Sequence, residues 1–211
     1  TNSATNPATY TVEDNVTFSD PSKTGYTFNG WYSNSQFTSA LVTGIPVGSH
    51  ENITIYANFG INQYTISFNS NGGTSVDDIT QNYATSISAP ANPAKNGYSF
   101  DGWYSDSTLK NGYMFTTIPA ENITLYAKWN LVTYNITYNL DGGTNSASNS
   151  ATYTIESATH NLADPAKTGY TFVGWYTDSS YNNPIEKIDN GSYGNKELFA
   201  KWQINTYSIT Y

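Results

Sequence analysis

The chain has 211 residues and a formal net charge of −8, from eight lysines and sixteen acidic residues, and it contains no cysteine. Neutralising phosphates needs clustered Lys or Arg, so this balance excludes sequence-independent nucleic-acid binding and disfavours an anionic membrane surface. No apolar run is long enough to span a bilayer, so no membrane insertion is expected. Aromatic residues make up 16% of the chain, and this apolar surface argues against disorder.

One eight-residue stretch recurs three times at a constant spacing. It reads GYTFNGWY at residues 25–32, GYSFDGWY at 97–104 and GYTFVGWY at 169–176. Successive copies start 72 residues apart, since 97 − 25 and 169 − 97 are both 72. A fixed period of this length predicts tandem copies of one small domain, each with its own core. The expected boundaries are 1–60 for repeat 1, 61–132 for repeat 2, 133–203 for repeat 3, and 204–211 for the first strand of a truncated fourth repeat.

Each repeat is expected to open with a strand and a tight turn. Residues 64–69 alternate apolar and polar side chains, the period-two pattern of a β-strand. The Asn-Gly-Gly run at 71–73 follows, because glycine takes up the positive φ of a turn without steric cost. Residues 134–143 repeat the pattern. A second, weaker strand is expected at residues 79–83.

A proline turn, NPAKNG at residues 92–97 in repeat 2, comes before the recurring eight-residue strand. Strict alternation in the first copy would put Phe28 and Trp31 on opposite faces. A bulge at Gly30 is therefore expected to return both side chains to the core. A loop of variable sequence follows, and repeat 2 closes with a strand at residues 123–129.

The largest side chains are expected in the core of each repeat. Because a small domain must bury its largest residues, we interpret the tryptophans as core residues rather than as sugar-stacking platforms. The core-defining residues are Trp31, Trp103, Trp129, Trp175 and Trp202, with Phe59 in the place of the last-strand tryptophan in repeat 1.

Tyrosine is the better candidate for contact with a partner. An exposed Tyr offers contact area at low entropic cost, although pairing across strands on an exposed face is the commoner role. The candidate contact residues are Tyr32, Tyr104 and Tyr176 beside the variable loop, and Tyr56 and Tyr126 on the outward face of the last strand.

No pattern in the sequence indicates catalysis, a metal or a cofactor. His50 and His160 are not repeat-equivalent, and no zinc or calcium spacing is present. Asp77, Asp78 and Asp141 lie in expected turns, where solvated carboxylates are the usual state. No nucleophile, base and acid recur in a fixed order. We therefore expect a protein that is not an enzyme and has no cofactor.

One lysine recurs before the glycine of each proline turn, as Lys23, Lys95 and Lys167. A lysine in such a turn is expected to be solvated. The alternative is an internal isopeptide link to Asn or Asp, which would lower the intact mass.

These stretches resemble a known family. The strand ending in NGG, the P-x-K-T-G-Y-T-F-x-G-W-Y segment and the closing L-Y-A-K-W strand are similar to the Listeria–Bacteroides repeat, the B-repeat of internalin-type surface proteins. The match covers nearly the whole chain and departs at Asn58-Phe59, where the other repeats have Lys-Trp. The resemblance implies a small β-grasp-like, SUMO-like domain without shared catalytic residues, extracellular at the bacterial cell surface or cell wall.

Two functions fit these features. Four residues separate Phe59 from Tyr64, and the other two linkers are equally long. Such linkers favour a mainly β, elongated rod over beads on a string. The first function is a non-catalytic stalk or spacer that projects an adhesive head. The alternative is a binding module that contacts host protein or glycan through the variable loops at 33–44, 105–114 and 177–184.

The two ends of the sequence carry complementary pieces of one repeat. TNSATNPATYTV at residues 1–12 matches TNSASNSATYTI at 144–155, so repeat 1 lacks the first strand that precedes this stretch in repeat 3. YSITY at the other end is a first strand without a following repeat. We expect Tyr207, Ile209 and Tyr211 to complete repeat 1 of another copy by β-strand addition, a head-to-tail self-association.

Overall fold

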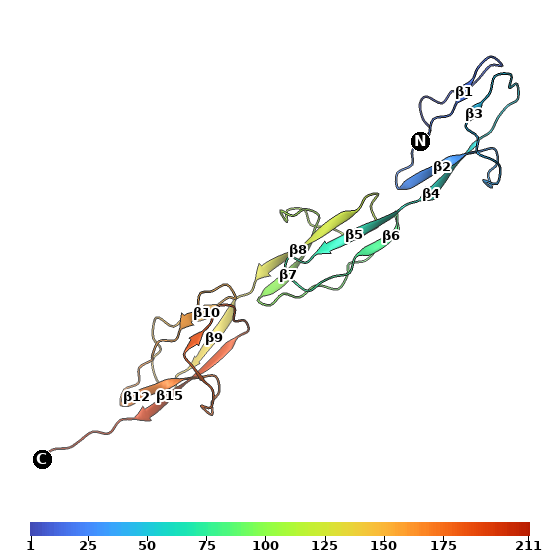
Figure 1. Cartoon of the computed structure of the whole chain (residues 1–211). Coiled ribbons are helices and arrows are strands. Elements are labelled where there is room, and N and C mark those ends of the chain that lie inside the picture. The colour runs from blue at the N-terminus through green and yellow to red at the C-terminus, as the bar shows by residue number, and fades with distance from the viewer. The chain divides into compact units, whose positions relative to one another are not determined.

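The structure, a computed structural model, describes all residues 1–211 and contains strands but no helix (Figure 1). It therefore holds no helix that is long and apolar enough to cross a membrane. The mainly β class predicted from the alternating segments is confirmed. Several small sheets form, as expected for tandem β repeats.

The strands follow the sequence repeats. Repeat 1 contains β1 (Val16–Thr17), β2 (Tyr26–Tyr32), β3 (Gly44–Ile45) and β4 (Tyr56–Ile61). Repeat 2 contains β5 (Gln63–Asn69), β6 (Ile79–Asn82), β7 (Tyr98–Tyr104) and β8 (Ile123–Leu131). Repeat 3 contains β9 (Tyr134–Asn139), β10 (Thr152–Tyr153), β11 (His160–Asn161), β12 (Tyr170–Tyr176), β13 (Pro184–Ile185), β14 (Lys187–Ile188) and β15 (Lys196–Ile204).

By its internal contacts the chain divides into two compact units, which are described separately. The first comprises residues 1–69, 75–91 and 103–126, and the second comprises residues 70–74, 92–102 and 127–211. The first unit thus holds repeat 1 with part of repeat 2, and the second holds the rest of repeat 2 with repeat 3. Each boundary between two repeats consequently lies inside one compact unit.

The first and last strands of repeats 2 and 3 lie side by side and run parallel. In repeat 2 the sheet order is β6-β5-β8-β7, with Ile66 opposite Ile123 in the parallel pair. In repeat 3 the order is β10-β9-β15-β12-β13, with Ile136 opposite Lys196. The second strand of each repeat joins the outer side of the first in antiparallel fashion. The first strand is therefore an interior strand of each sheet, paired on both sides.

Repeat 1 has no counterpart of β5 or β9. Its longest pairing is the two-stranded sheet of β2 and β4. β4 begins only at Tyr56, whereas β8 begins at Ile123, whose counterpart is Ile53. Residues 53–55 are irregular because the parallel neighbour that orders them in the other repeats is absent.

The bulge expected in the recurring eight-residue strand is present in repeats 1 and 3. The register between β2 and β4 shifts between Phe28 and Gly30, and that between β12 and β15 shifts between Phe172 and Gly174. The shift returns Phe28 and Trp31 to one face, where their ring centroids are 5.5 Å apart. The bulge prediction is confirmed for these two strands.

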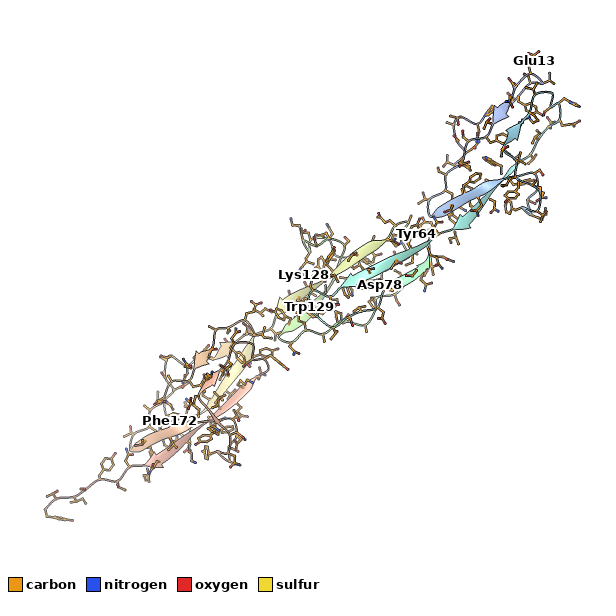
Figure 2. The ribbon with its side chains drawn as sticks, in the orientation of Figure 1. Glu13, Tyr64, Asp78, Lys128, Trp129 and Phe172 are labelled. Carbon is orange, nitrogen blue, oxygen red and sulfur yellow. The ribbon has the colours of Figure 1, made fainter.

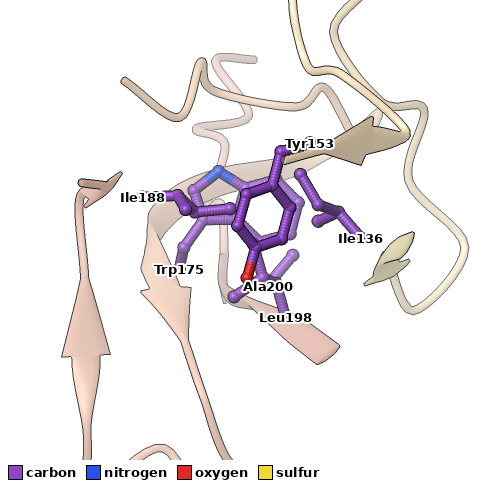
Figure 3. Close-up of a cluster of buried hydrophobic side chains, with 6 residues drawn as sticks. All are labelled: Ile136, Tyr153, Trp175, Ile188, Leu198 and Ala200. Atoms are coloured by element: carbon purple, nitrogen blue, oxygen red, sulfur yellow. The ribbon is translucent and has the colours of Figure 1, made fainter. Parts of the chain in front are cut away.

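Repeat 3 shows the core of a repeat with its full set of strands (Figure 3). Leu198 and Ala200 of β15 alternate toward the centre and are almost fully buried. Trp175 of β12 covers them, and its indole N–H donates to the carbonyl oxygen of Ala163 at 3.1 Å. The buried cluster consists of Ile136, Tyr153, Trp175, Ile188, Leu198 and Ala200.

Candidate functional site: the joint between repeats

A backbone hydrogen bond recurs at the exit of every repeat. The third residue after the last-strand aromatic donates its backbone N–H to the carbonyl oxygen of the proline-turn glycine. The three pairs are Asn62 to Gly25 at 3.0 Å, Val132 to Gly97 at 2.9 Å and Asn205 to Gly169 at 2.9 Å. The short linker is therefore tied to the preceding repeat as it leaves the sheet.

A side chain of the following repeat packs against the same glycine. Tyr83, just after β6, stands over Gly25, and a Cβ added at Gly25 would lie 2.1 Å from its ring. Ile155, 72 residues later, stands over Gly97, where an added Cβ would lie 2.5 Å from the Ile155 Cβ. Both glycines have φ near +80°, a left-handed conformation that favours glycine. Only glycine therefore allows this close approach.

Aromatic packing completes the first joint. The Tyr83 ring meets Tyr26 of repeat 1 edge to face, with centroids 6.1 Å apart, and meets Tyr64 of repeat 2 at 6.5 Å. The backbone N–H of Tyr83 donates to the Asn62 carbonyl oxygen at 2.8 Å. Edge-to-face pairs of this kind add stability beyond their buried area. Tyr83 thus binds the linker and both neighbouring repeats.

The second joint has a side-chain hydrogen bond in place of the edge-to-face aromatic pairs of the first. The Tyr98 hydroxyl donates to Oε1 of Glu156, the residue after Ile155. The carboxylate that accepts this hydrogen bond raises the pKa of the Tyr98 phenol above its usual value. In both joints a side chain of the following repeat, the plug (Tyr83 or Ile155), packs on the proline-turn glycine, the socket (Gly25 or Gly97). The joints differ in the other contacts made around this pair.

The recurring lysine packs on aromatic rings, one of which belongs to the residue that follows the glycine. The Lys167 ammonium lies 4.3 Å from the Tyr170 ring centroid and 5.8 Å from that of Trp202, and it pairs with Oδ2 of Asp141 at 2.9 Å. Lys23 and Lys95 make matching contacts with their own aromatic pairs. The expectation of a solvated lysine is wrong for Lys167, whose side chain is 16% exposed, because its stem and charge cover aromatic faces.

The last socket has no plug in this chain. No atom lies within 4 Å of the position that a Cβ on Gly169 would take, although its φ of +81° matches the other two glycines. The neighbouring Tyr170 is exposed, and so are Tyr207, Ile209 and Tyr211.

The predicted core residues differ in how much of the side chain is buried. Trp103 and Trp175 are almost fully buried. Trp31, Trp129, Trp202 and Phe59 are half-buried. The indole N–H groups of Trp129 and Trp202 donate to the carbonyl oxygens of Ser70 and Leu140 at 2.9 and 3.0 Å. These last-strand tryptophans therefore fasten the turn after the first strand. Trp129 is labelled in Figure 2.

The three variable loops share one backbone conformation. Position 37, 109 or 181 has a left-handed backbone in each loop. In each loop one side chain accepts hydrogen bonds from backbone N–H groups of the loop. These side chains occupy equivalent positions, 72 residues apart: Asn34, Asp106 and Asp178. The pKa of Asp106 is lowered to about 2 by the hydrogen bonds from the Thr108 side chain and the Asn111 backbone.

The candidate contact tyrosines beside these loops already have partners in the chain. Tyr32 packs on Phe37 with centroids 5.5 Å apart, and Tyr176 packs on Tyr181 at 5.4 Å. Tyr104 is half-buried and bridges to Gly112 across its loop. On the last strands Tyr56 is exposed and Tyr126 is half-buried. A role of these residues in binding stays a prediction.

Sequence reasoning missed the plug residues and the role of the lysines. The signal for the plug was an apolar residue at a fixed distance, 72 residues from Tyr83 to Ile155, directly after the second strand. Its counterpart in repeat 1 is Val12, which aligns with Ile155 in the stretch TYTV against TYTI.

The Listeria-Bacteroides repeat domain matches this chain three times, at residues 1–58, 64–128 and 134–201. The chain belongs to the Listeria-Bacteroides repeat domain family. The predicted resemblance is confirmed, and each of the three matches contains one copy of the recurring strand.

Three relatives of this chain come from two bacteria. A protein of Evansella cellulosilytica named "Putative membrane protein" is 38% identical over 90% of this chain and 28% of its own length. A second protein of that organism is 36% identical over 90% of the chain and 22% of its length. Internalin H of Listeria monocytogenes is 39% identical over 52% of the chain and 20% of its length. The chain is thus a repeat segment of an internalin-like bacterial surface-protein family, and it spans under a third of these relatives.

Proposed function

We propose that this segment is a non-catalytic stalk at the outer surface or wall of a bacterial cell, where it holds an adhesive head away from the surface. The observation that carries the proposal is the joint. The same backbone hydrogen bond ties every linker to the preceding repeat, and in two joints a side chain of the next repeat fills the glycine socket. Joints of this kind restrict bending, which a spacer needs.

The sheet order supports a β-grasp-like class for each repeat. In repeats 2 and 3 the first and last strands form a parallel central pair flanked by antiparallel neighbours. Loops and turns take the place of a covering helix. Repeats of this kind in series, with linkers of four residues, would form an elongated rod.

The rod is tested by loosening one joint. We would insert a Gly-Ser-Gly-Ser segment after Val132, with the same insertion after Lys110 in a variable loop as the matched control. Small-angle scattering should give an extended chain for the native protein and the loop control, and a broader distribution of sizes for the joint variant. A compact native protein with its repeats folded onto one another would refute the stalk.

A second candidate function is recognition through the variable loops. The three loops share their backbone conformation and the position of their capping side chain but differ in other side chains, such as the exposed Met114. A fixed scaffold with varied tips suits contact with host protein or glycan. Exchanging the loop at 105–114 for that at 177–184 should change binding in glycan-array and cell-binding assays. Binding unchanged by the exchange would rule this out.

A further inference from the structure

The sequence contains five Asn-Gly pairs, and one of them forms the socket of the second joint. The pairs start at Asn29, Asn71, Asn96, Asn111 and Asn190. In the pair that starts at Asn96, the glycine is Gly97, on which Ile155 packs. The positions equivalent to Asn96 hold Thr24 and Thr168. Only the socket of repeat 2 therefore has an asparagine before its glycine.

An asparagine followed by glycine is prone to lose its side-chain amide spontaneously. The backbone nitrogen of the glycine bonds to the side-chain carbon Cγ and loses its proton, and ammonia leaves, which closes a succinimide ring. Water then opens the ring at either carbonyl group. One opening gives aspartate, and the other gives isoaspartate, in which the main chain runs through the side-chain carbons. Glycine favours ring closure because it has no Cβ to block the approach and restricts the backbone least.

The turn around Gly97 leaves both reacting groups without a hydrogen bond. Tyr98 donates its backbone N–H to the Lys95 carbonyl oxygen at 3.1 Å, and Gly97 has φ of +80°. These are features of a type II turn with Asn96 and Gly97 at its central positions. The amide between the two central residues takes no part in the turn hydrogen bond, and the Gly97 N–H donates to no other group. The Asn96 side chain is exposed and makes no hydrogen bond in the structure.

Three of the other pairs are held in ways that oppose ring closure. The Asn71 side-chain amide donates to the Ala127 carbonyl oxygen at 2.7 Å, and that of Asn190 donates to the Ser157 carbonyl oxygen at 2.8 Å. Asn29 lies within β2, whose backbone is fixed by its pairing with β4. Ring closure at these asparagines must first break a hydrogen bond or rotate a paired strand.

Asn111 is exposed like Asn96 but lies away from any joint. It belongs to a variable loop, where its backbone N–H donates to Oδ2 of Asp106 at 2.8 Å. No neighbouring atom lies within 4 Å of a Cβ built on Gly112. A change at Asn111 thus provides a comparison within the same chain, because it touches no contact of the joint.

Isoaspartate at position 96 changes the joint because it inserts an additional main-chain carbon directly before Gly97. Two contacts of the joint depend on where Gly97 lies. Its carbonyl oxygen accepts the Val132 N–H at 2.9 Å, and Ile155 stands over it. The turn hydrogen bond from Tyr98 also spans the inserted carbon. Displacement of Gly97 therefore weakens the tie to the linker and the packing of the plug together.

We propose that Asn96 is a site of spontaneous deamidation to isoaspartate, which loosens the joint between repeats 2 and 3 with time. The reaction consumes the water that opens the ring and releases the ammonia that leaves Cγ. The joint between repeats 1 and 2 has Thr24 at this position. Threonine cannot form the ring, so that joint keeps its contacts. The inference rests on the geometry of the joint and does not depend on the stalk function.

Incubation of the chain in mildly alkaline buffer tests the chemistry. Trypsin cleaves after Lys95 and Lys110 and releases residues 96–110, in which Asn96 is the only asparagine. This peptide should gain the mass difference between an amide and a carboxyl group, and an isoaspartyl methyltransferase should label it. Asn96 should convert several-fold faster than Asn71 and Asn190, which are followed in their own tryptic peptides.

Hydrogen exchange of the Val132 amide measures the joint. Its protection should fall in step with the isoaspartate content of the sample. The protection of Asn62, which donates to Gly25 in the first joint, should stay constant. Asn96→Thr, with the residue of the other two repeats, is the matched control, and it should keep Val132 protected throughout while Asn111 still reacts.

Asn96→Asp separates the new charge from the inserted carbon. Freshly prepared, this variant carries the carboxylate with a normal main chain, so Val132 should be as well protected as in the native chain. Weakened protection in the fresh variant would overturn the role of isoaspartate and assign the loosening to the charge.

Two further outcomes would overturn the proposal. Asn96 could convert no faster than Asn71 and Asn190, in which case the turn gives it no special reactivity. Alternatively, Asn96 could convert while the exchange of Val132 stays equal to that in Asn96→Thr, in which case the joint tolerates the inserted carbon.

Discussion

Alanine at Gly25, Gly97 and Gly169 measures the packing of the joint against an internal control. The three glycines have φ of +77°, +80° and +81°, so an alanine at any of them carries the same left-handed strain of about 1–2 kcal/mol. They differ in what stands over them. Nothing contacts a Cβ at Gly169, whereas a Cβ at Gly97 meets the Ile155 Cβ at 2.5 Å.

The difference between the three variants isolates the joint. The Ile155 Cβ is attached to its own backbone and cannot rotate away, so Gly97→Ala forces the neighbouring segments apart at an additional cost of about 1–3 kcal/mol. The obstruction at Gly25 is the ring of Tyr83, a side chain that can turn aside, although its edge-to-face contact with Tyr26 is then lost. We expect Gly97→Ala to destabilise most, Gly25→Ala less, and Gly169→Ala least.

Urea unfolding followed by hydrogen exchange resolved for each repeat provides the measurement. Gly97→Ala should weaken protection in both repeats 2 and 3, while Gly169→Ala should affect repeat 3 alone. Adding Ile155→Ala to Gly97→Ala should restore part of the loss, because it removes Cγ2 and Cδ1 of Ile155, which would lie 2.5 and 2.8 Å from the added Cβ, and leaves only the contact with the Ile155 Cβ. Equal costs at all three positions would refute the joint as a packed contact.

Three further predictions concern the core, acid and metals. Trp103→Ala should destabilise repeat 2 by about 3–5 kcal/mol in thermal or urea unfolding, because the ring is almost fully buried; a change within experimental error would place the ring outside the core. The pKa of Asp106 is lowered to about 2, below its unfolded value of about 3.9, so its contribution to stability is present above the unfolded pKa and is lost as pH falls toward 2. Amide shifts of Asn111 should move over that range while those of Thr38, held by the neutral Asn34, should not; equal movement would remove the carboxylate as the cause. Chelator should leave the melting temperature unchanged, and a fall of several degrees would point to Asp77, Asp78 or Asp141 as ligands.

The sequence period predicted the elements well because each is specified locally. Alternating side chains predict the strands, the Gly-Gly turns end the first strand, and the paired Phe28 and Trp31 require the bulge that the register shows. The β class and the family follow from these local signals. The eight-residue strand occurs three times and the Gly-Gly turn twice, so each copy supports the interpretation of the others.

The joint could not be predicted in the same way, because it depends on where two repeats meet. Nothing in the sequence around Gly97 says that Ile155, 58 residues away, will stand over it. A recurring glycine in a proline turn has a sufficient local reason, the positive φ of the turn. The lysine was misinterpreted for a similar reason, since only the folded chain brings Lys167 over Tyr170 and Trp202.

The parallel pairing of the first and last strands has a mechanical consequence. A repeat pulled by its two ends is held at the start of one central strand and at the end of its parallel neighbour, as in β9 and β15. The tension then runs along the strands in opposite directions, and the hydrogen bonds between them share it at once instead of opening one after another. Repeats 2 and 3 are built to resist shear in this way.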